Sequence, residues 1–388
     1  MSTSGPDTGA PGGRGTWAES RLVTLLLLAV MLLWVLAFVP DPWVIATLPG
    51  IIGLLTLVER APTTRRALFL VACFGAVGIG TGYHWLAQTV QDFGKQSPPA
   101  AYVLTALFGV IGTVHAFLFV PAYRALLRRG HRPHPMTVAA LIVAVETLPI
   151  RLFPWMVGHA AIDAPAVAQH AEWGGVPAVS FLVLCFAVAT YELLVWAWRP
   201  TRPRARPAAA MFTLLVAVLA VGWGTWRNAQ ILDEEAAAER SLKVGIVQAN
   251  IGGEAKRSAE NGDPAARRRS QEAYVQGSKE VLAAGVDLVV WPESAVTAAV
   301  PFHQAPGMID DYIDQYLDQY LLRDKRHRFL HNHGSEAAFL IGSYEEYRTE
   351  RSSPLKVARG RSVDRYNTAA LRVRPKAGGK PQWSTVRK

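Results

Sequence analysis

The sequence predicts a polytopic α-helical membrane domain followed by a separate α/β domain. Apolar segments of membrane-spanning length fill the first part of the chain. The composition changes from apolar with scattered arginines before about residue 227 to that of a soluble protein after about residue 239. The second part then alternates strand-forming and helix-forming patterns. With 388 residues, the chain has room for both domains.

Seven segments approach the roughly 20 apolar residues that a transmembrane helix needs. They are Leu22–Val39, Trp43–Val58, Ala67–Leu86, Ala101–Tyr123, Met136–Phe153, Val179–Trp198 and Ala208–Trp226. The second segment is short and contains a Pro-Gly pair at 49–50, which is also compatible with a re-entrant helix. The fifth contains Glu146, and an intramembrane carboxylate is a functional candidate by default. Pairing with Arg151 would explain Glu146 equally well.

The basic residues orient these segments. With a cytoplasmic N-terminus and seven crossings, thirteen arginines fall on the cytoplasmic side and only Lys95 and Arg151 on the other. The thirteen are Arg14, Arg21, Arg60, Arg65, Arg66, Arg124, Arg128, Arg129, Arg132, Arg199, Arg202, Arg204 and Arg206. This asymmetry follows the positive-inside rule and predicts that the C-terminal domain lies outside the cytoplasm.

The formal net charge of +10 has the same origin. We interpret the loop arginines as facing anionic lipid headgroups, so the expected partner is a membrane and not nucleic acid. The run 267–269, three arginines in the second domain, is interpreted as a solvated helix face.

Three regions follow from these observations. Residues 1–21 are predicted to be disordered, 22–227 form the membrane domain, and 240–388 form the α/β domain. Both cysteines, Cys73 and Cys185, fall in predicted spans and are interpreted as packing residues. The second domain therefore has no disulfide and no thiol nucleophile.

No cofactor or metal is expected, because the sequence has no glycine-rich phosphate loop and no His/Cys metal spacing. His327, His331 and His333 are interpreted as surface residues.

The second domain has strand–helix–strand order, which favours an α/β fold with at least partly parallel pairing. The expected strands cover 241–250, 286–291, 337–344 and 366–373, and the expected helices 264–284 and 307–322. Gly285 is a plausible helix C-cap.

The strongest site candidate is Glu293, which follows the apolar strand and a Trp291-Pro292 step. In α/β folds the carboxyl ends of strands border the ligand crevice, so this position favours a reactive carboxylate.

Three groups of motifs carry a resemblance to a known family. The first is Gly82–Trp85 with Gln91–Gly94. The second is Phe153–Trp155 with Ala168–Gln169, Gly174–Val176 and Ser180–Val183. The third is Val244–Asn250 with Trp291–Ser294 and Tyr366–Ala369. In this order they resemble the apolipoprotein N-acyltransferase family, in which a nitrilase-like (carbon–nitrogen hydrolase) αββα sandwich is carried on a polytopic membrane domain.

The resemblance implies acyl transfer in lipoprotein maturation by a Glu-Lys-Cys triad. An acyl chain passes from a phospholipid donor to the N-terminal diacylglyceryl-cysteine of an apolipoprotein, on the periplasmic side of the inner (cytoplasmic) membrane. Glu293 would take the role of the general base. Lys388 would take the role of the oxyanion lysine, although it could equally be an ordinary basic residue.

No residue matches the nucleophilic cysteine of the family. We therefore expect a C-terminally truncated member with an incomplete α/β domain, inactive alone. Two alternatives stay open: a non-catalytic membrane scaffold protein, which the missing cysteine favours, and a membrane-anchored carbon–nitrogen hydrolase.

Overall fold

The structure is a computed structural model, and it divides the chain into two compact units on either side of the Ala237–Ala238 bond. It describes residue 33 and residues 44–79, 82–129, 132–148, 155–198, 207–239, 241–292, 295–296, 338–348, 363–373 and 382–387. Each unit is described by itself.

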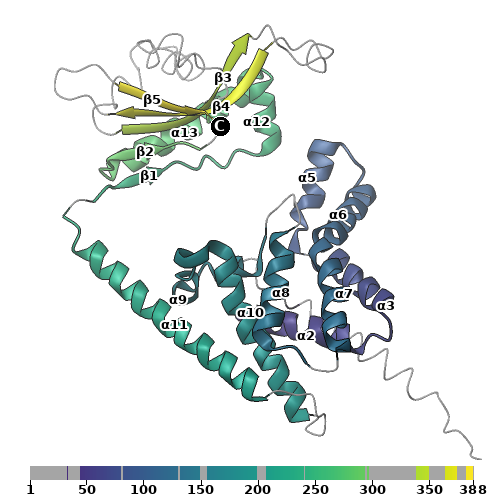
Figure 1. The fold of residues 1–388 in the computed structure, drawn as a ribbon. Coiled ribbons are helices and arrows are strands. Elements are labelled where there is room, and N and C mark those ends of the chain that lie inside the picture. The colour runs from purple at the N-terminus through teal and green to yellow at the C-terminus, as the bar shows by residue number, and fades with distance from the viewer. Residues whose placement is uncertain are drawn as a thin grey trace, which may run out of the picture. The chain divides into compact units, whose positions relative to one another are not determined.

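Within the described residues, the first unit is helical (Figure 1). Its elements are η2 (Val44–Ala46), α2 (Thr47–Arg60), α3 (Thr64–Phe74), η3 (Gly75–Ile79), α5 (Trp85–Gly94), α6 (Pro98–Gly112), α7 (Val114–Arg128), α8 (Pro135–Thr147), η4 (Val157–Ala161), α9 (Pro165–Ala168), α10 (Ala171–Trp198) and α11 (Pro207–Ala236).

Three helical stretches among the described residues are long and apolar enough to cross a membrane, which fits a helical membrane domain. They are Pro98–Arg128 (α6 with α7), α10 and α11. Helices α2, α3 and α8 match predicted spans but have only 14, 11 and 13 residues. At 1.5 Å per residue such helices reach about 16 to 21 Å, less than the roughly 30 Å hydrocarbon core. The first predicted span lies outside the described residues except for Leu33, so seven crossings stay a prediction.

Two helix-breaking signals act differently in the structure. Pro49 lies in the first turn of α2, where a missing N–H costs no intrahelical hydrogen bond, so α2 continues through it. In α10 the backbone leaves helical geometry at Gly174 and Gly175. Gly175 has a φ of 63°, which favours glycine, and the long apolar part of α10 begins after this kink.

The core of the first unit lies between α2, α3, α7, α8 and α10. Phe119 and Tyr123 of α7 are buried there and stack with ring centroids 5.3 Å apart. Close helix approaches need glycine: a Cβ on Gly109 of α6 would sit 2.3 Å from the Gly75 carbonyl oxygen. Small residues at helix contacts are typical of membrane helices.

Side-chain contacts group the helix termini at two ends of the first unit. Arg132, between α7 and α8, pairs with Glu59 near the end of α2 and Glu192 near the end of α10. Trp155, which follows α8, contacts Tyr83, which precedes α5. Because α8 runs from one group to the other, we call them the Arg132 end and the Trp155 end.

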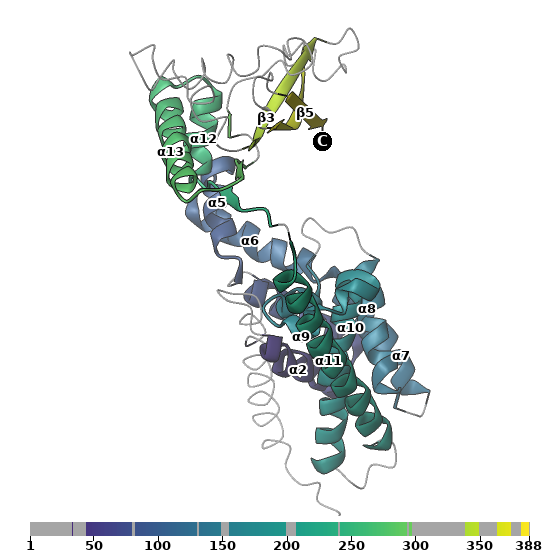
Figure 2. The ribbon, with the colours of Figure 1, turned by 90° about the vertical axis from the view of Figure 1, so that its left-hand side faces the viewer.

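The described part of the second unit is a mixed sheet with two helices. Its elements are β1 (Val244–Ile246), α12 (Gly253–Glu260), α13 (Pro264–Ala283), β2 (Leu288–Val290), β3 (Ala338–Arg348), β4 (Val363–Val373) and β5 (Gln382–Arg387). The strand order is β1-β2-β3-β4-β5, with β1, β2 and β3 parallel and β4 antiparallel to both β3 and β5. Helix α13 packs on β1 and β2, and α12 lies alongside α13 (Figure 2).

The predicted strands, the helix 264–284 and the partly parallel pairing are confirmed within the described residues. Gly285 follows the helix with a φ of 67°, as expected for a C-cap glycine. Helix α12 and strand β5 were not predicted, because both segments are polar and lack a clear period. The expected helix 307–322 and the three histidines at 327, 331 and 333 lie outside the described residues.

One expectation about the sheet interior was wrong in part. The apolar strand pattern predicts that Val244, Ile246 and Val247 lie in the sheet interior. Val247 is 4% exposed, as expected, but Val244 and Ile246 are 43% and 68% exposed. Strand β1 lies at the edge of the described sheet, and only Gly245 between them is buried, against Val281 of α13.

Candidate functional site

Backbone hydrogen bonds hold the chain on both sides of the β2 carboxyl end. The Val247 N–H donates to the Val290 carbonyl oxygen at 2.9 Å, and the Trp291 N–H donates to the Leu340 carbonyl oxygen at 2.8 Å. The backbone pairing of β2 with β1 therefore continues to Val247, and its pairing with β3 continues to Trp291. Pro292 is the first residue after this pairing.

Trp291 anchors this strand end to α13. Its side chain is 2% exposed, and its indole Nε1–H donates to Ser278 Oγ at 2.9 Å. Its ring lies 5.3 Å from the ring of Tyr274, centroid to centroid. Further on, the Ala295 N–H donates to the Pro292 carbonyl oxygen at 3.2 Å, and Ala295 is buried. Trp291 and Ala295 are thus both held in the core of the second unit.

Glu293 and Lys388 themselves lie outside the described residues. Their described neighbours share one edge of the sheet, because β2 and β5 run in the same direction across β3 and β4. Along the register, Val290 aligns through Leu340 and Leu371 with Ser384. Three strand spacings separate β2 from β5, roughly 14 Å at about 4.8 Å per spacing.

The first two motif groups meet at the Trp155 end of the first unit. The Tyr83 ring lies 6.1 Å from that of Trp85 and 5.9 Å from that of Trp155, and Trp155 contacts His159 at 5.7 Å. Trp85 and Trp155 are 47% and 42% exposed. This arrangement is typical of aromatic residues at a membrane interface.

Glu146 is buried close to this end, near the end of α8. Its Oε2 lies 3.5 Å from the Val157 N–H, a long contact for a hydrogen bond. Arg151, its expected partner, lies outside the described residues.

A buried charge cluster at the Arg132 end was not predicted. Arg132 is 6% exposed, and its Nε donates to both carboxylate oxygens of Glu192, at 2.9 and 2.7 Å. Its Nη1 and Nη2 donate to the two oxygens of Glu59 at 2.9 and 2.7 Å. Tyr123 donates its hydroxyl to Glu59 Oε1 at 2.7 Å, and the Arg132 guanidinium lies 5.6 Å from the Tyr191 ring.

This cluster corrects the interpretation of two loop arginines. Burial alone would lower the pKa of Arg132, but the hydrogen bonds with Glu192 and Glu59 outweigh it and raise the pKa above its usual value. Arg124 donates Nη1 to the carbonyl oxygens of Val58 and Ala61, at 2.7 and 2.8 Å. Arg124 and Arg132 therefore serve the protein interior and not lipid headgroups.

The run 267–269 largely behaves as expected. Arg268 and Arg269 are exposed, and Arg268 pairs with Glu272 at 2.7 Å. Arg267 is half-buried and donates to the Ala259 carbonyl oxygen of α12 at 2.6 Å. Within the described ranges, no cluster of three or more His, Cys, Asp or Glu side chains could hold a metal ion.

Helices long and apolar enough to span a membrane, followed in the chain by a mixed-sheet unit, fit an integral membrane protein that carries a second domain. Residues 31–189 match the family model of the apolipoprotein N-acyltransferase N-terminal domain. The chain belongs to the apolipoprotein N-acyltransferase family.

Curated relatives extend the similarity beyond that domain. The apolipoprotein N-acyltransferase of Pseudomonas paraeruginosa is 32% identical over 284 residues, covering 70% of this chain and 51% of the relative. The enzyme of Pseudomonas putida is 30% identical over 295 residues, covering 74% and 54%. That of Vibrio parahaemolyticus is 27% identical over 274 residues, covering 68% and 49%. The chain spans about half the length of the curated relatives it matches.

Proposed function

We propose that this chain serves acyl transfer from a phospholipid to the N-terminal diacylglyceryl-cysteine of apolipoproteins, with Glu293 as general base. The family membership supports the reaction class. The observation that carries the residue assignment is the anchored strand end: Trp291, fixed by Ser278 and Tyr274, lies two residues before Glu293. Rigid support of this kind is what a catalytic carboxylate needs.

The proposed chemistry has two half-reactions. The Glu293 carboxylate takes the proton of a cysteine thiol, and the thiolate attacks the ester carbonyl carbon of the phospholipid. Lys388 stabilises the tetrahedral oxyanion, which collapses to a thioester while Glu293 returns the proton to the leaving lysophospholipid oxygen. The amino group of the apolipoprotein then attacks the thioester, forms the amide and releases the thiol.

The sequence contains no cysteine after Cys185, which is buried in α10. We therefore propose that the chain supplies the base and the lysine, and that a thiol from outside this sequence completes the triad. By itself, the chain is expected to form no acyl-thioester.

We propose a nitrilase-like αββα architecture for residues 240–388 and a place in the inner (cytoplasmic) membrane, with the second domain on the periplasmic side. The grouping of helix ends supports this orientation. Arg60 ends α2, Arg128 ends α7, and Arg132 lies between α7 and α8. The ion pairs of Arg132 gather these helix ends at the Arg132 end. Basic residues gathered at one end are expected at the cytoplasmic surface.

A non-catalytic membrane scaffold is the second candidate function, and the missing cysteine favours it. A membrane-anchored carbon–nitrogen hydrolase has less support, because the similarity covers the membrane domain. The test is fragment complementation in a bacterium depleted of its own apolipoprotein N-acyltransferase. The chain is co-expressed with the C-terminal half of the Pseudomonas paraeruginosa relative, and N-acylation of a reporter lipoprotein is read by mass spectrometry.

We expect N-acylation that is lost in Glu293→Gln and strongly reduced in Lys388→Ala. Glu280→Gln, which changes an exposed carboxylate of α13, is the matched control and should keep full activity. Retained N-acylation in Glu293→Gln would remove Glu293 from its proposed role. Correctly inserted protein without any N-acylation would favour the scaffold.

A further inference from the structure

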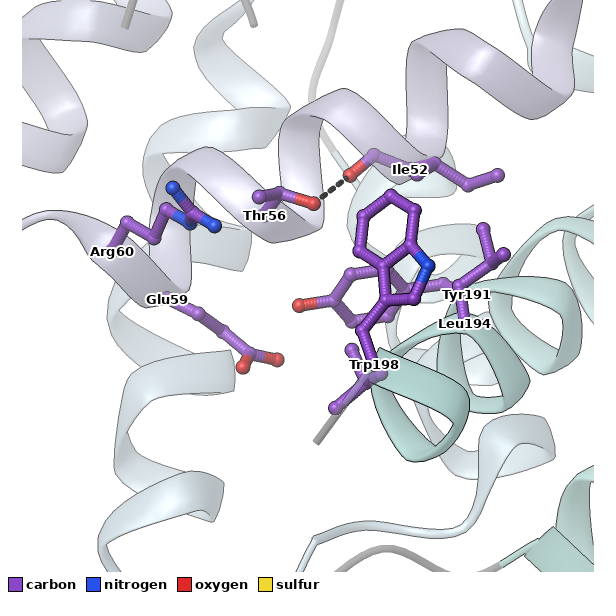
Figure 3. Close-up of a pocket in the computed structure, with 8 residues that line it drawn as sticks. Ile52, Thr56, Glu59, Arg60, Tyr191, Leu194 and Trp198 are labelled. Atoms are coloured by element: carbon purple, nitrogen blue, oxygen red, sulfur yellow. Dashed lines mark hydrogen bonds between the residues drawn. The ribbon is translucent and has the colours of Figure 1, made fainter. Parts of the chain in front are cut away.

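A pocket of about 230 Å³ lies between α2 and α10 at the Arg132 end. It is lined by Ile52, Thr56, Glu59, Arg60, Tyr191, Leu194, Val195 and Trp198 (Figure 3). At about 30 Å³ per water molecule, this volume suits a glycerol-phosphate group and not a whole lipid.

The pocket has a polar end and an apolar end. Figure 3 shows Glu59, Arg60 and the Tyr191 hydroxyl on one side, and Ile52, Leu194 and Trp198 on the other. Between them, Thr56 donates its hydroxyl to the Ile52 carbonyl oxygen at 2.7 Å. Thr56 therefore has its donor satisfied within α2. This division matches an amphiphile with a charged head and an apolar tail.

The charge at the polar end favours an anion. The Glu59 carboxylate is already held by Arg132 and by the Tyr123 hydroxyl. Arg60 is exposed and has no carboxylate partner among the described residues. Arg132 pairs with both Glu59 and Glu192, and Arg124 donates to two backbone carbonyl oxygens nearby. Counted with Arg60, three guanidinium groups stand against two carboxylates. The surplus positive charge belongs to Arg60, at the pocket.

The pocket also lies where a lipid head is expected. Trp198 is 80% exposed at the last residue of α10, and tryptophan prefers the headgroup level of a bilayer. The sequence continues from Trp198 with four arginines, at 199, 202, 204 and 206. The buried ion pairs between Arg132 and both walls, Glu59 of α2 and Glu192 of α10, keep the pocket open at a fixed width.

We propose that this pocket binds an anionic phospholipid from the leaflet at the Arg132 end. Its phosphate lies at Arg60, and its glycerol and the start of an acyl chain lie against Ile52, Leu194 and Trp198. This goes beyond the proposed acyl transfer, because the bound lipid is a structural ligand at the opposite membrane surface from the Trp155 end and is not consumed.

The test measures lipid binding to the purified full chain by native mass spectrometry, with phosphatidylglycerol and phosphatidylcholine offered in detergent. We expect a preference for phosphatidylglycerol that falls about fivefold in Arg60→Gln, because one arginine–headgroup attraction is lost. The preference should be kept in Arg60→Lys, because the positive charge remains. Leu194→Trp, which fills the pocket, should remove the preference.

Arg65→Gln is the matched control, because Arg65 is exposed in the first turn of the neighbouring helix α3 and does not line the pocket. An equal loss of the phosphatidylglycerol preference in Arg60→Gln and Arg65→Gln would mean a general attraction of the anionic lipid to surface arginines. That result would overturn the proposed binding in the pocket. Equal binding of both lipids would overturn the charge argument. If Leu22–Val39 fills the pocket instead, Leu194→Trp would lower thermal stability without changing lipid preference.

Discussion

At the scale of single residues, the sequence located isolated charges but not their partners. In the sequence, Arg132 is 73 positions from Glu59 and 60 positions from Glu192, so no local pattern connects them. The available signal was Glu192 itself, a carboxylate inside a predicted apolar span, which is a functional candidate by default. Its partner could be found only by folding the chain.

Removing the cation from this cluster should be costly. Arg132→Met removes the cation from the buried Glu192 and from the partly buried Glu59, and breaking such a cluster typically costs about 3 to 5 kcal/mol. We expect a marked fall in the thermal unfolding midpoint of the detergent-solubilised chain, followed by circular dichroism. Arg129→Met, an exposed neighbour, should leave the midpoint unchanged.

Replacing all three charged members at once, as Glu59→Gln, Arg132→Met and Glu192→Gln, should recover most of the lost stability, because no uncompensated charge remains. An Arg132→Met midpoint equal to that of Arg129→Met would show that the cluster does not hold the helix ends together.

The anchor beside Glu293 can be tested in the same way. Trp291→Phe removes the indole donor to Ser278 and should cost about 1 kcal/mol, as should Ser278→Ala. Because both changes break the same bond, the double variant should cost less than the sum of the two, by roughly the energy of that bond. The measurement is protease resistance of the second unit in the full chain, and strict additivity would rule out the coupling.

At the scale of elements, helix positions followed from apolar length and composition, but helix interruptions did not. The predicted span Ala101–Tyr123 is divided into α6 and α7 at Thr113, where Gly75 packs so closely that a Cβ on it would meet Thr113 at 2.6 Å. Such breaks are set by packing, which a single sequence does not display. The strand before Glu293 was predictable because its apolar pattern is local. Its distance from β5 was not, because it depends on how distant strands pair.

The crossing of α9 and α11 offers a matched pair of glycines. A Cβ on Gly224 would sit 1.8 Å from the Ala166 carbonyl oxygen, whereas a Cβ on Gly222 would meet nothing within 4 Å. Gly224→Ala should therefore force the helices apart and cost about 1 to 3 kcal/mol. Gly222→Ala should be neutral or stabilise α11 by up to about 1 kcal/mol. The measurement is the thermal unfolding midpoint of each variant. Equal midpoints would contradict the close approach of Gly224 to Ala166.

At the scale of the whole molecule, the charge pattern and the contacts between helix ends describe one arrangement. Arg60, Arg132 and Trp198 belong to one end of the membrane domain, and Tyr83 and Trp155 to the other. Helix α11 begins nine residues after Trp198 and precedes the second unit in the chain. In the proposed orientation, with the Arg132 end in the cytoplasm, a single crossing by α11 would put the second unit on the periplasmic side.

Cysteine labelling tests this topology directly. In a chain with Cys73 and Cys185 changed to alanine, single cysteines replace the exposed residues Lys95, Arg129 and Glu280. A membrane-impermeant maleimide, applied to cells with a permeabilised outer membrane, should label positions 95 and 280. Position 129 should react only after the inner membrane is opened, because the proposed orientation puts the Arg132 end in the cytoplasm. Labelling of 129 together with 280 in intact cells would mean an even number of crossings between them and would overturn the cytoplasmic position of the Arg132 end. If position 280 reacts only after the inner membrane is opened, the proposed periplasmic site at Glu293 would lie on the wrong side of the membrane for apolipoprotein substrates.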